Sequence, residues 1–120
     1  MSPTSTNNPA PGDVVLFEVP FTDLSQRKKR PALVLLSRGQ DHLVAFLTSR
    51  LEQAGRDDVI VAASKANGLA VNSAALVTKL FTLHDSLIVR TLGHLETSDH
   101  RAVVERLVNL LSATIDEKPA

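Results

Sequence analysis

The stretch PALVLLSRGQDHLVAFLTS, residues 31–49, contains two apolar runs separated by a short polar segment. The first run, 31–37, is continuously apolar and starts with proline, which a strand tolerates at its first residue. The second run, 43–49, has the Val, Phe and Thr content of a strand, and the five residues between the runs suit a hairpin. We therefore predict two adjacent antiparallel strands.

Three further runs, 13–19, 59–63 and 73–83, are short, apolar and bounded by turn signals. One of these signals is Gly68, which is available for a positive φ. Residues 84–95 have room for one helical turn that ends near Gly93. Many short strands separated by turns are typical of a small barrel or sandwich. We expect five or six strands in an antiparallel, barrel-like sheet that a C-terminal helix closes.

The helix is predicted from Thr97 onwards, because the apolar residues there recur at intervals of three and four. Thr97 or Ser98 is the expected cap, and Asp99 lies favourably in the first turn. The apolar face has two interpretations: it closes the barrel, or it contributes to a dimer surface. The residues of this face are Val103, Val104, Leu107, Leu110 and Leu111.

Length and composition indicate one globular domain, since the chain has 120 residues with 43% apolar and 22% charged residues. We expect a disordered tail over 1–11, a domain over 12–113 and a second tail over 114–120. No membrane span or signal peptide is recognisable, so we expect a cytoplasmic protein that does not contact a membrane. Without cysteine, and with four histidines that lack metal-ligand spacing, the chain is expected to hold no metal and no cofactor.

Positive charge is concentrated in one segment of a chain whose formal net charge is zero. Between residues 27 and 50, six cationic side chains accompany a single acid, Asp41, which gives an excess of five positive charges. Pairing of the predicted hairpin brings Arg30 beside Thr48, Ser49 and Arg50. Fixed guanidinium groups with nearby hydroxyls suit a phosphodiester. The six cations are Arg27, Lys28, Lys29, Arg30, Arg38 and Arg50.

The same residues have a purely structural interpretation. A run of four cations is often a solvated loop, and a Thr-Ser pair at the end of a strand is often a turn. Composition alone leaves both interpretations open.

Four ordered segments resemble the MazF/PemK family of toxins. They are GDVVLFEVPFTDLSQRKKRPALVLLS (12–37), VAFLTSR (44–50), GLAVNSAALV (68–77) and TLGHL (91–95), the last followed by an amphipathic helix. The resemblance covers residues 12 to about 111. It implies the toxin of a type II toxin–antitoxin pair with an SH3-like barrel fold. It further implies a homodimeric, metal-independent endoribonuclease that cleaves single-stranded RNA, with an antitoxin as partner.

The resemblance also assigns site residues. The arginine of the family's Arg-Pro pair is Arg30, and the threonine that ends the third strand is Thr48; both are implied to be catalytic. Some relatives instead use an arginine and an aspartate on the strand equivalent to 74–80, but that segment reads AALVTKL here. Arg30 stabilises charge well and is a poor general base. The general base is left unidentified: Asp23 is one candidate, and His42 or His84 are others if folding brings them close.

RNA binding is expected from the polar and cationic residues around this pair. Lys28 and Lys29 are expected to attract the phosphate backbone, while Thr22, Ser25, Gln26 and Ser49 are expected to read bases of a single strand. Structural roles are expected for His94 and His100. The full expected RNA-binding set is Thr22, Ser25, Gln26, Arg27, Lys28, Lys29, Ser49 and Arg50.

Two other functions fit the resemblance. CcdB-like toxins have the same fold and inhibit DNA gyrase by binding it, without nuclease activity, so the fold does not decide between the two activities. A relative that has lost nuclease activity would retain only RNA or antitoxin binding. The Arg30/Thr48 pair favours the nuclease, because a gyrase-binding protein does not need it.

Overall fold

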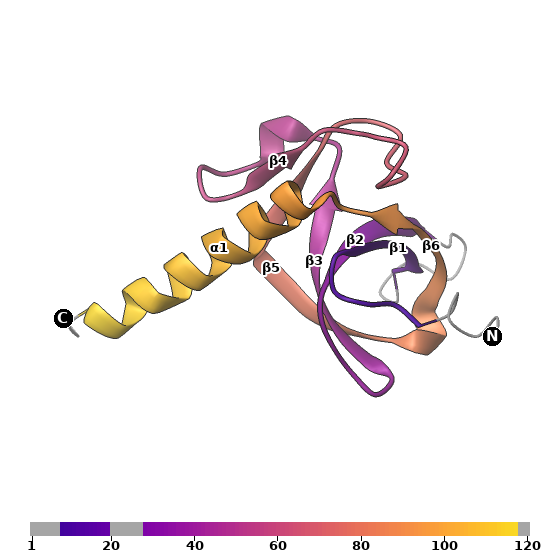
Figure 1. Ribbon diagram of the computed structural model, residues 1–120, viewed down its shortest axis with the longest axis horizontal. Coiled ribbons are helices and arrows are strands. Elements are labelled where there is room, and N and C mark those ends of the chain that lie inside the picture. Colours follow the sequence, from indigo (N-terminus) through magenta and orange to yellow (C-terminus); the bar gives the residue numbers. More distant parts are fainter. Residues whose placement is uncertain (1–7, 20–27, 118–120) are drawn as a thin grey trace.

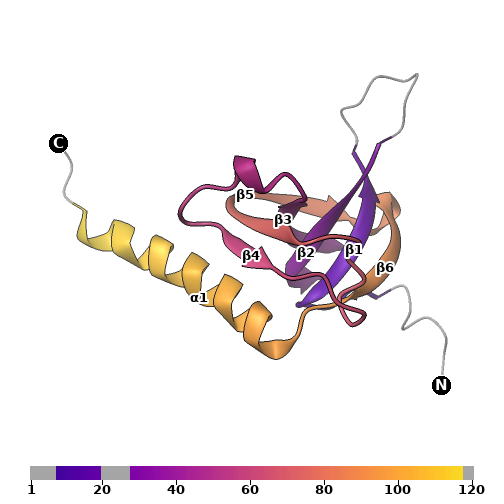
Figure 2. The ribbon, with the colours of Figure 1, turned by 90° about the horizontal axis from the view of Figure 1, so that it is seen from above.

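The computed structural model describes residues 8–19 and 28–117. Over these residues the chain forms six strands, one α-helix and three short 3₁₀ helices. The strands make one antiparallel sheet in the order β4-β5-β3-β2-β1-β6, and the helix α1 comes after β6 in the chain (Figures 1 and 2). The predicted mainly β fold with a C-terminal helix is therefore confirmed. The bounds are β1 Asp13–Glu18, β2 Lys29–Arg38, β3 Asp41–Thr48, β4 Val59–Val61, β5 Ser73–His84, β6 Ile88–His94 and α1 Thr97–Ala113.

The predicted hairpin is present as β2 and β3, which pair antiparallel with Ala32 opposite Phe46 and Arg38 opposite Asp41. Only Gly39 and Gln40 connect the two strands, and Gly39 adopts φ +61°, as tight hairpin turns require. The strands therefore run together from this turn to the opposite end of the sheet, where β3 ends at Thr48.

The segment after β5 differs from its prediction. One helical turn does form, as the 3₁₀ helix Asp85–Leu87, but the chain then continues as strand β6 rather than ending a helix near Gly93. The sixth strand pairs with β1, with two shifts of register. Gly93 lies inside this strand, where a Cβ atom would come 2.2 Å from the Ala66 carbonyl oxygen. Its role is to allow close backbone approach.

The two edge strands of the sheet, β4 and β6, do not pair with each other in the described structure. The loop 62–72 after β4 instead crosses to β6, where the His94 amide donates a 2.8 Å hydrogen bond to the Ala66 carbonyl oxygen. Gly68 has φ +70°, and a Cβ atom there would come 2.2 Å from the Leu92 carbonyl oxygen. The barrel-like shape thus comes from a curved, open sheet that this loop completes (Figure 1).

Two apolar clusters cover the two faces of the sheet, because alternate residues of each strand point to opposite sides. One cluster includes Val15, Phe17 and Val34, and the rings of Phe17, Phe46 and Phe81 pack together with centroids 4.6 to 5.9 Å apart. The other cluster includes Leu33, Leu47 and Val103, and so joins the sheet to the helix.

Helix α1 projects away from the sheet (Figures 1 and 2). Val103 is its one buried residue, and Leu110 packs partly against the core. The predicted cap is wrong: Glu96 occupies the N-cap position without a side-chain cap bond, and Thr97 is already helical. Asp99 lies in the first turn, as predicted.

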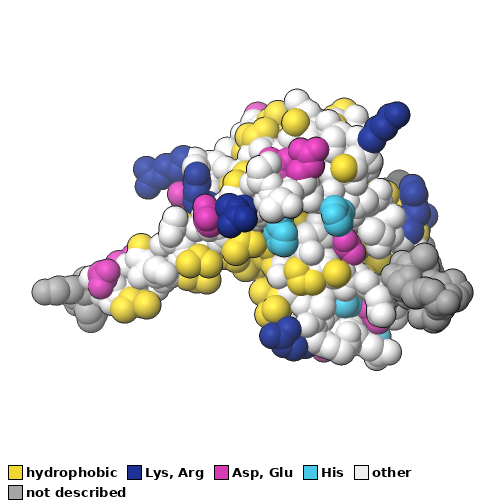
Figure 3. Space-filling model, in the orientation of Figure 1, with side chains coloured by type: hydrophobic (Ala, Val, Ile, Leu, Met, Phe, Trp, Pro, Cys, Tyr) yellow, Lys and Arg dark blue, Asp and Glu magenta, His cyan; other side chains and the backbone are white. Residues whose placement is uncertain are grey.

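One side of the projecting part of the helix is apolar and exposed (Figure 3). Four residues spaced by three or four form this apolar stripe: Val104, Val108, Leu111 and Ile115, with exposed fractions of 37, 52, 60 and 81%. Val104 and Leu111, which the sequence places on one apolar face with Val103, are therefore exposed rather than part of the core.

The chain ends lie partly within the described residues. Pro9 is buried, and its carbonyl oxygen accepts a 3.3 Å hydrogen bond from the Ser37 hydroxyl. Residues Thr114–Asp116 extend the helix as a 3₁₀ turn. The rest of the expected tails, 1–7 and 118–120, lies outside the described residues.

Candidate RNA-cleavage site

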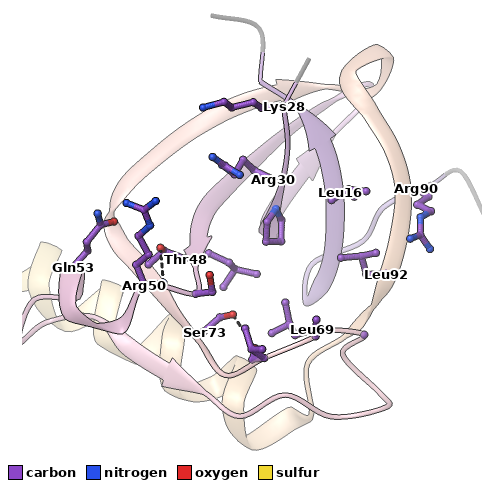
Figure 4. A pocket seen from close by; sticks show the side chains of 16 residues that line it. Leu16, Lys28, Arg30, Thr48, Arg50, Gln53, Leu69, Ser73, Arg90 and Leu92 are labelled. Atoms are coloured by element: carbon purple, nitrogen blue, oxygen red, sulfur yellow. Dashed lines mark hydrogen bonds between the residues drawn. The ribbon is translucent and has the colours of Figure 1, made fainter. Parts of the chain in front are cut away.

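A pocket of about 830 Å³ lies where β2 begins and β3 ends (Figure 4). Strands β1 and β6 and the loop 62–72 form its other walls. Its lining residues are Leu16, Lys28, Arg30, Pro31, Leu47, Thr48, Ser49, Arg50, Gln53, Gly68, Leu69, Ala70, Val71, Ser73, Arg90 and Leu92.

Arg30 and Thr48 both line this pocket, as the hairpin predicts. The register that sets Ala32 opposite Phe46 places Arg30 level with Thr48 when it is continued by two residues along each strand. Arg30 is exposed and Thr48 is half-buried. The arginine is held by the strand on its other side as well, because Phe17 of β1 lies opposite it. Two neighbouring strands therefore support this guanidinium.

The end of β3 is stabilised by the Thr48 side chain, whose Oγ1 accepts a 3.1 Å hydrogen bond from the Arg50 amide (Figure 4). The chain then turns into the 3₁₀ helix Leu51–Gln53, and Gln53 reaches the pocket from there. Ser49 and Arg50 both line the pocket and are exposed.

The charge of the lining is one-sided. Four of the described residues that line the pocket are cationic, namely Lys28, Arg30, Arg50 and Arg90. The described lining contains no Asp, Glu or His. In a chain of zero formal net charge, this pocket is therefore a local concentration of positive charge. Such a surface attracts anionic ligands.

The wall opposite β3 is built by the loop 62–72, which the buried side chain of Asn67 holds together. Asn67 donates to the Ala62 carbonyl oxygen at 2.9 Å and accepts from the Ser64 and Leu69 amides at 3.0 Å. Gly68 follows and has the positive φ that the sequence suggested. The loop thus presents residues 68–71 to the pocket in a defined conformation.

Two cations of the basic segment, Lys29 and Arg38, do not line the pocket. Lys29 lies opposite Glu18 on β1 and does not line the pocket. Arg38 is at the turn end of the hairpin, away from Thr48. The predicted residues Thr22, Asp23, Ser25, Gln26 and Arg27 lie outside the described residues, so their roles remain predictions.

The two histidines proposed as alternative bases are in the wrong place. His42 and His84 lie at the turn end of the hairpin, where His42 is opposite Leu83 and Asp41 is opposite His84, so neither reaches the pocket. His42 is buried and bridges two polar groups, with its Nδ1 2.7 Å from the Ser37 hydroxyl and its Nε2 2.5 Å from an Asp85 carboxylate oxygen. It is a structural residue.

The remaining histidines also make structural contacts. The His94 Nδ1 atom lies 3.3 Å from the carboxylate of Asp13. His100 packs against Gly12, where a Cβ atom would come 3.0 Å from its ring.

Arg90 and Gln53 line the pocket but were not predicted. Arg90 lies far from the basic segment in sequence and reaches the pocket through the pairing of β6 with β1. Alternation along IVRTL was the available signal for a strand that would expose this arginine. Gln53 had no recognisable signal in the polar connection after β3.

No helix within 8–19 and 28–117 has the length and apolar character needed to cross a membrane. No group of three or more His, Asp or Glu side chains in the same ranges is arranged to hold a metal ion.

Comparison with known proteins agrees with this architecture. No curated protein matches the sequence. Three solved structures align with TM-scores of 0.66 to 0.67: an endoribonuclease in complex with its cognate antitoxin from a mycobacterial species, the toxin MazF-mt6 of Mycobacterium tuberculosis, and MazF of Deinococcus radiodurans. The identities are 15, 22 and 22%, the alignments cover 92, 83 and 87% of this chain, and they cover 99, 96 and 96% of those chains.

At these identities the structures establish the fold, and a family match establishes membership. Residues 10–111 match the family described as PemK-like, MazF-like toxin of type II toxin-antitoxin system. The match includes every strand and most of the helix. The chain is therefore a member of the PemK/MazF family of type II toxins.

Proposed function

We propose that this protein is the toxin of a type II toxin–antitoxin pair and cleaves single-stranded RNA in the cationic pocket. The observation that carries the proposal is the pocket lining: Arg30 lies level with Thr48, and the described lining residues include four cations and no acid. RNA brings negative charge to this surface, and the family match supports the same activity.

The proposed reaction uses a nucleophile within the RNA itself. The 2′-hydroxyl oxygen attacks the adjacent phosphorus, the bond to the 5′-oxygen breaks, and the products are a 2′,3′-cyclic phosphate and a 5′-hydroxyl. A base accepts the 2′-hydroxyl proton, and the leaving oxygen takes up another proton. Because the nucleophile is supplied by the substrate, positioning and charge stabilisation are sufficient, and no metal is required.

Arg30 is proposed to donate two hydrogen bonds to the non-bridging phosphate oxygens as negative charge builds up on them. The Thr48 hydroxyl is proposed to bind the same phosphate or to orient the 2′-hydroxyl. Lys28 and Arg50 add positive charge to this part of the pocket, and Ser49 is proposed to hydrogen-bond a base. Asp23 remains the candidate base.

Incubation of single-stranded RNA with the purified protein in EDTA tests the proposal. We expect cleavage to continue in EDTA and to leave a 2′,3′-cyclic phosphate. A substrate with a single 2′-deoxynucleotide at the cleaved position should stay intact, because the nucleophile is missing. Cleavage that needs added Mg²⁺, or that tolerates the deoxy substitution, would contradict the mechanism.

The same preparation separates the alternative activity. If RNA remains intact while DNA gyrase supercoiling is inhibited, the CcdB-like function replaces the one proposed. If the protein binds RNA but neither cleaves it nor inhibits gyrase, it has lost nuclease activity.

The antitoxin is proposed to inhibit the enzyme by occupying the cationic pocket, where it competes with RNA for Arg30 and its neighbours. An acidic or carboxylate-bearing segment matches a lining whose described residues include four cations and no acid. Because both RNA and antitoxin are expected in the cytoplasm, we expect the protein to act there.

A homodimer is proposed as the active assembly. The apolar stripe of α1 and the 3₁₀ turn that follows it offers four exposed hydrophobic side chains, on the side of the helix away from Val103, which packs into the core. Exposed apolar surface of this kind is buried when two copies associate.

A further inference from the structure

Arg90 lines the pocket from β6, which is separated by β1 from the strand that carries Arg30. It lies on β6 opposite Leu16 of β1, and Leu16 in turn lies opposite Pro31 of β2. This row crosses three neighbouring strands. Because strands in a sheet are spaced by about 4.8 Å, the Cα atoms of Arg90 and Pro31 are separated by about 10 Å.

The surface between the two arginines is apolar. Leu16 lies between Arg30 and Arg90, and Leu92 reaches the same part of the pocket from β6 (Figure 4). Both leucines are only partly buried, so part of their surface is open to a ligand. A group that spans from Arg30 to Arg90 must therefore pass over an apolar surface.

The Arg90 guanidinium is exposed, and it forms no ion pair or hydrogen bond with any residue of the described chain. A structural arginine is normally paired with a carboxylate or with carbonyl oxygens, as Arg106 is with the carbonyl oxygens of Arg56 and Asp57. Arg90 thus keeps its full hydrogen-bonding capacity for a ligand in the pocket.

We propose that Arg90 binds a second phosphate of the RNA, next along the strand from the one held at Arg30. The nucleoside between the two phosphates then lies over Leu16 and Leu92. This inference rests on the proposed function, and it extends the binding site across β1 to β6. It makes Arg90 a substrate-binding residue whose contact is the same before and during the reaction, so its loss raises KM and leaves kcat unchanged.

Binding measurements with RNAs in which one phosphate at a time is made neutral test whether Arg90 binds this second phosphate. The substrate is a short RNA that the wild-type enzyme cleaves, made non-cleavable by 2′-deoxy substitution at the cleaved position. A set of derivatives carries one neutral methylphosphonate in turn at each remaining linkage. Dissociation constants are measured for wild type, Arg90→Ala and Arg38→Ala, the last being an arginine at the opposite end of the hairpin.

The expected result is that Arg90→Ala weakens binding of the fully charged RNA about tenfold. The slope of log K against the logarithm of the salt concentration should also become less steep by about 0.7, the value for one phosphate contact of a single strand. At the linkage next to the cleaved one, methylphosphonate should weaken binding to wild type and to Arg38→Ala but not to Arg90→Ala. In the cleavable RNA, Arg90→Ala should raise KM alone.

Other outcomes distinguish the failures. If the methylphosphonate penalty at every linkage is the same for wild type and Arg90→Ala, Arg90 contacts no phosphate and the inference is wrong, while RNA cleavage itself stands. If Arg90→Ala lowers kcat instead, Arg90 acts on the cleaved phosphate and the assignment to a second one is wrong. If wild type cleaves no RNA, the proposed function and this inference fail together.

Discussion

Arg30 on β2 lies level with Thr48 on β3 at the end of the hairpin opposite its turn, and both side chains line one pocket. Strand pairing holds both residues, which limits how far either can move from the other. A catalytic pair needs such support, because small displacements of reacting groups cost large factors in rate.

Replacing Thr48 by valine should lower the cleavage rate about 10- to 100-fold, because valine lacks the hydroxyl that is proposed to contact the phosphate or the 2′-hydroxyl. Thr48→Ser keeps the hydroxyl and should retain most of the activity. Single-turnover cleavage rates measure both effects. Equal rates for wild type and the valine variant would remove Thr48 from the mechanism.

Gly68→Ala should reduce the free energy of unfolding by about 3 kcal/mol or more, since strain at positive φ adds to backbone overlap. The added Cβ atom would come 2.2 Å from the Leu92 carbonyl oxygen, so the loop 62–72 must shift away from β6. Gly39→Ala is the matched control: it also has positive φ but has open space around it, and it should cost about 1 kcal/mol. Urea unfolding compares the two, and equal losses would show that the overlap with Leu92 is relieved without cost.

Asn67→Ala should destabilise the protein by about 3 kcal/mol, because the Ser64 and Leu69 amides and the Ala62 carbonyl oxygen lose a buried partner. Asn72→Ala removes one bond, from the Ala63 amide to an exposed side chain, and should cost about 1 kcal/mol or less. Thermal unfolding gives the comparison. If the two variants were equally stable, the network around Asn67 would not be what holds the pocket wall.

Val108→Asp should convert a dimer into a monomer, because it places a charge in the apolar stripe of α1. The side chain is already 52% exposed, so the fold of each protomer should be unaffected. Asn109→Asp adds the same charge beside the stripe and should leave the dimer intact. Sedimentation velocity distinguishes the two states, and an unchanged mass for Val108→Asp would place the dimer contact elsewhere.

Local pattern was enough to predict the centre of the fold. The hairpin over 31–49 follows from two apolar runs and a short turn, and its pairing alone brings Arg30 to Thr48. The same geometry already separates His42 from the site, because residue 42 follows the turn while residue 48 ends the strand. The helix from Thr97 follows from its apolar spacing, although the spacing cannot show that two of the five residues of this face, Val104 and Leu111, stay exposed.

Features that depend on long-range contacts were not predictable in this way. Strand β6 contains Gly93, which weakens a strand signal, and the strand forms because it pairs with β1 about eighty residues earlier in the sequence. Arg90 reaches the pocket only through that pairing. The N-cap at Glu96 has no side-chain bond to mark it, so the search for a Ser or Thr cap selected the wrong residue.

The Arg30 guanidinium is proposed to stabilise the transition state of RNA cleavage. The most direct test of this role is the single-turnover rate of RNA cleavage in EDTA for Arg30→Ala and Arg30→Lys, with Arg38→Ala as the control for loss of one positive charge. Arg30→Ala should be slower than wild type by a factor of about 100 to 1,000, and lysine should restore little because it cannot form the bidentate contact. Arg38→Ala should match wild type. A rate for Arg30→Ala within a few-fold of the wild-type rate would contradict the account.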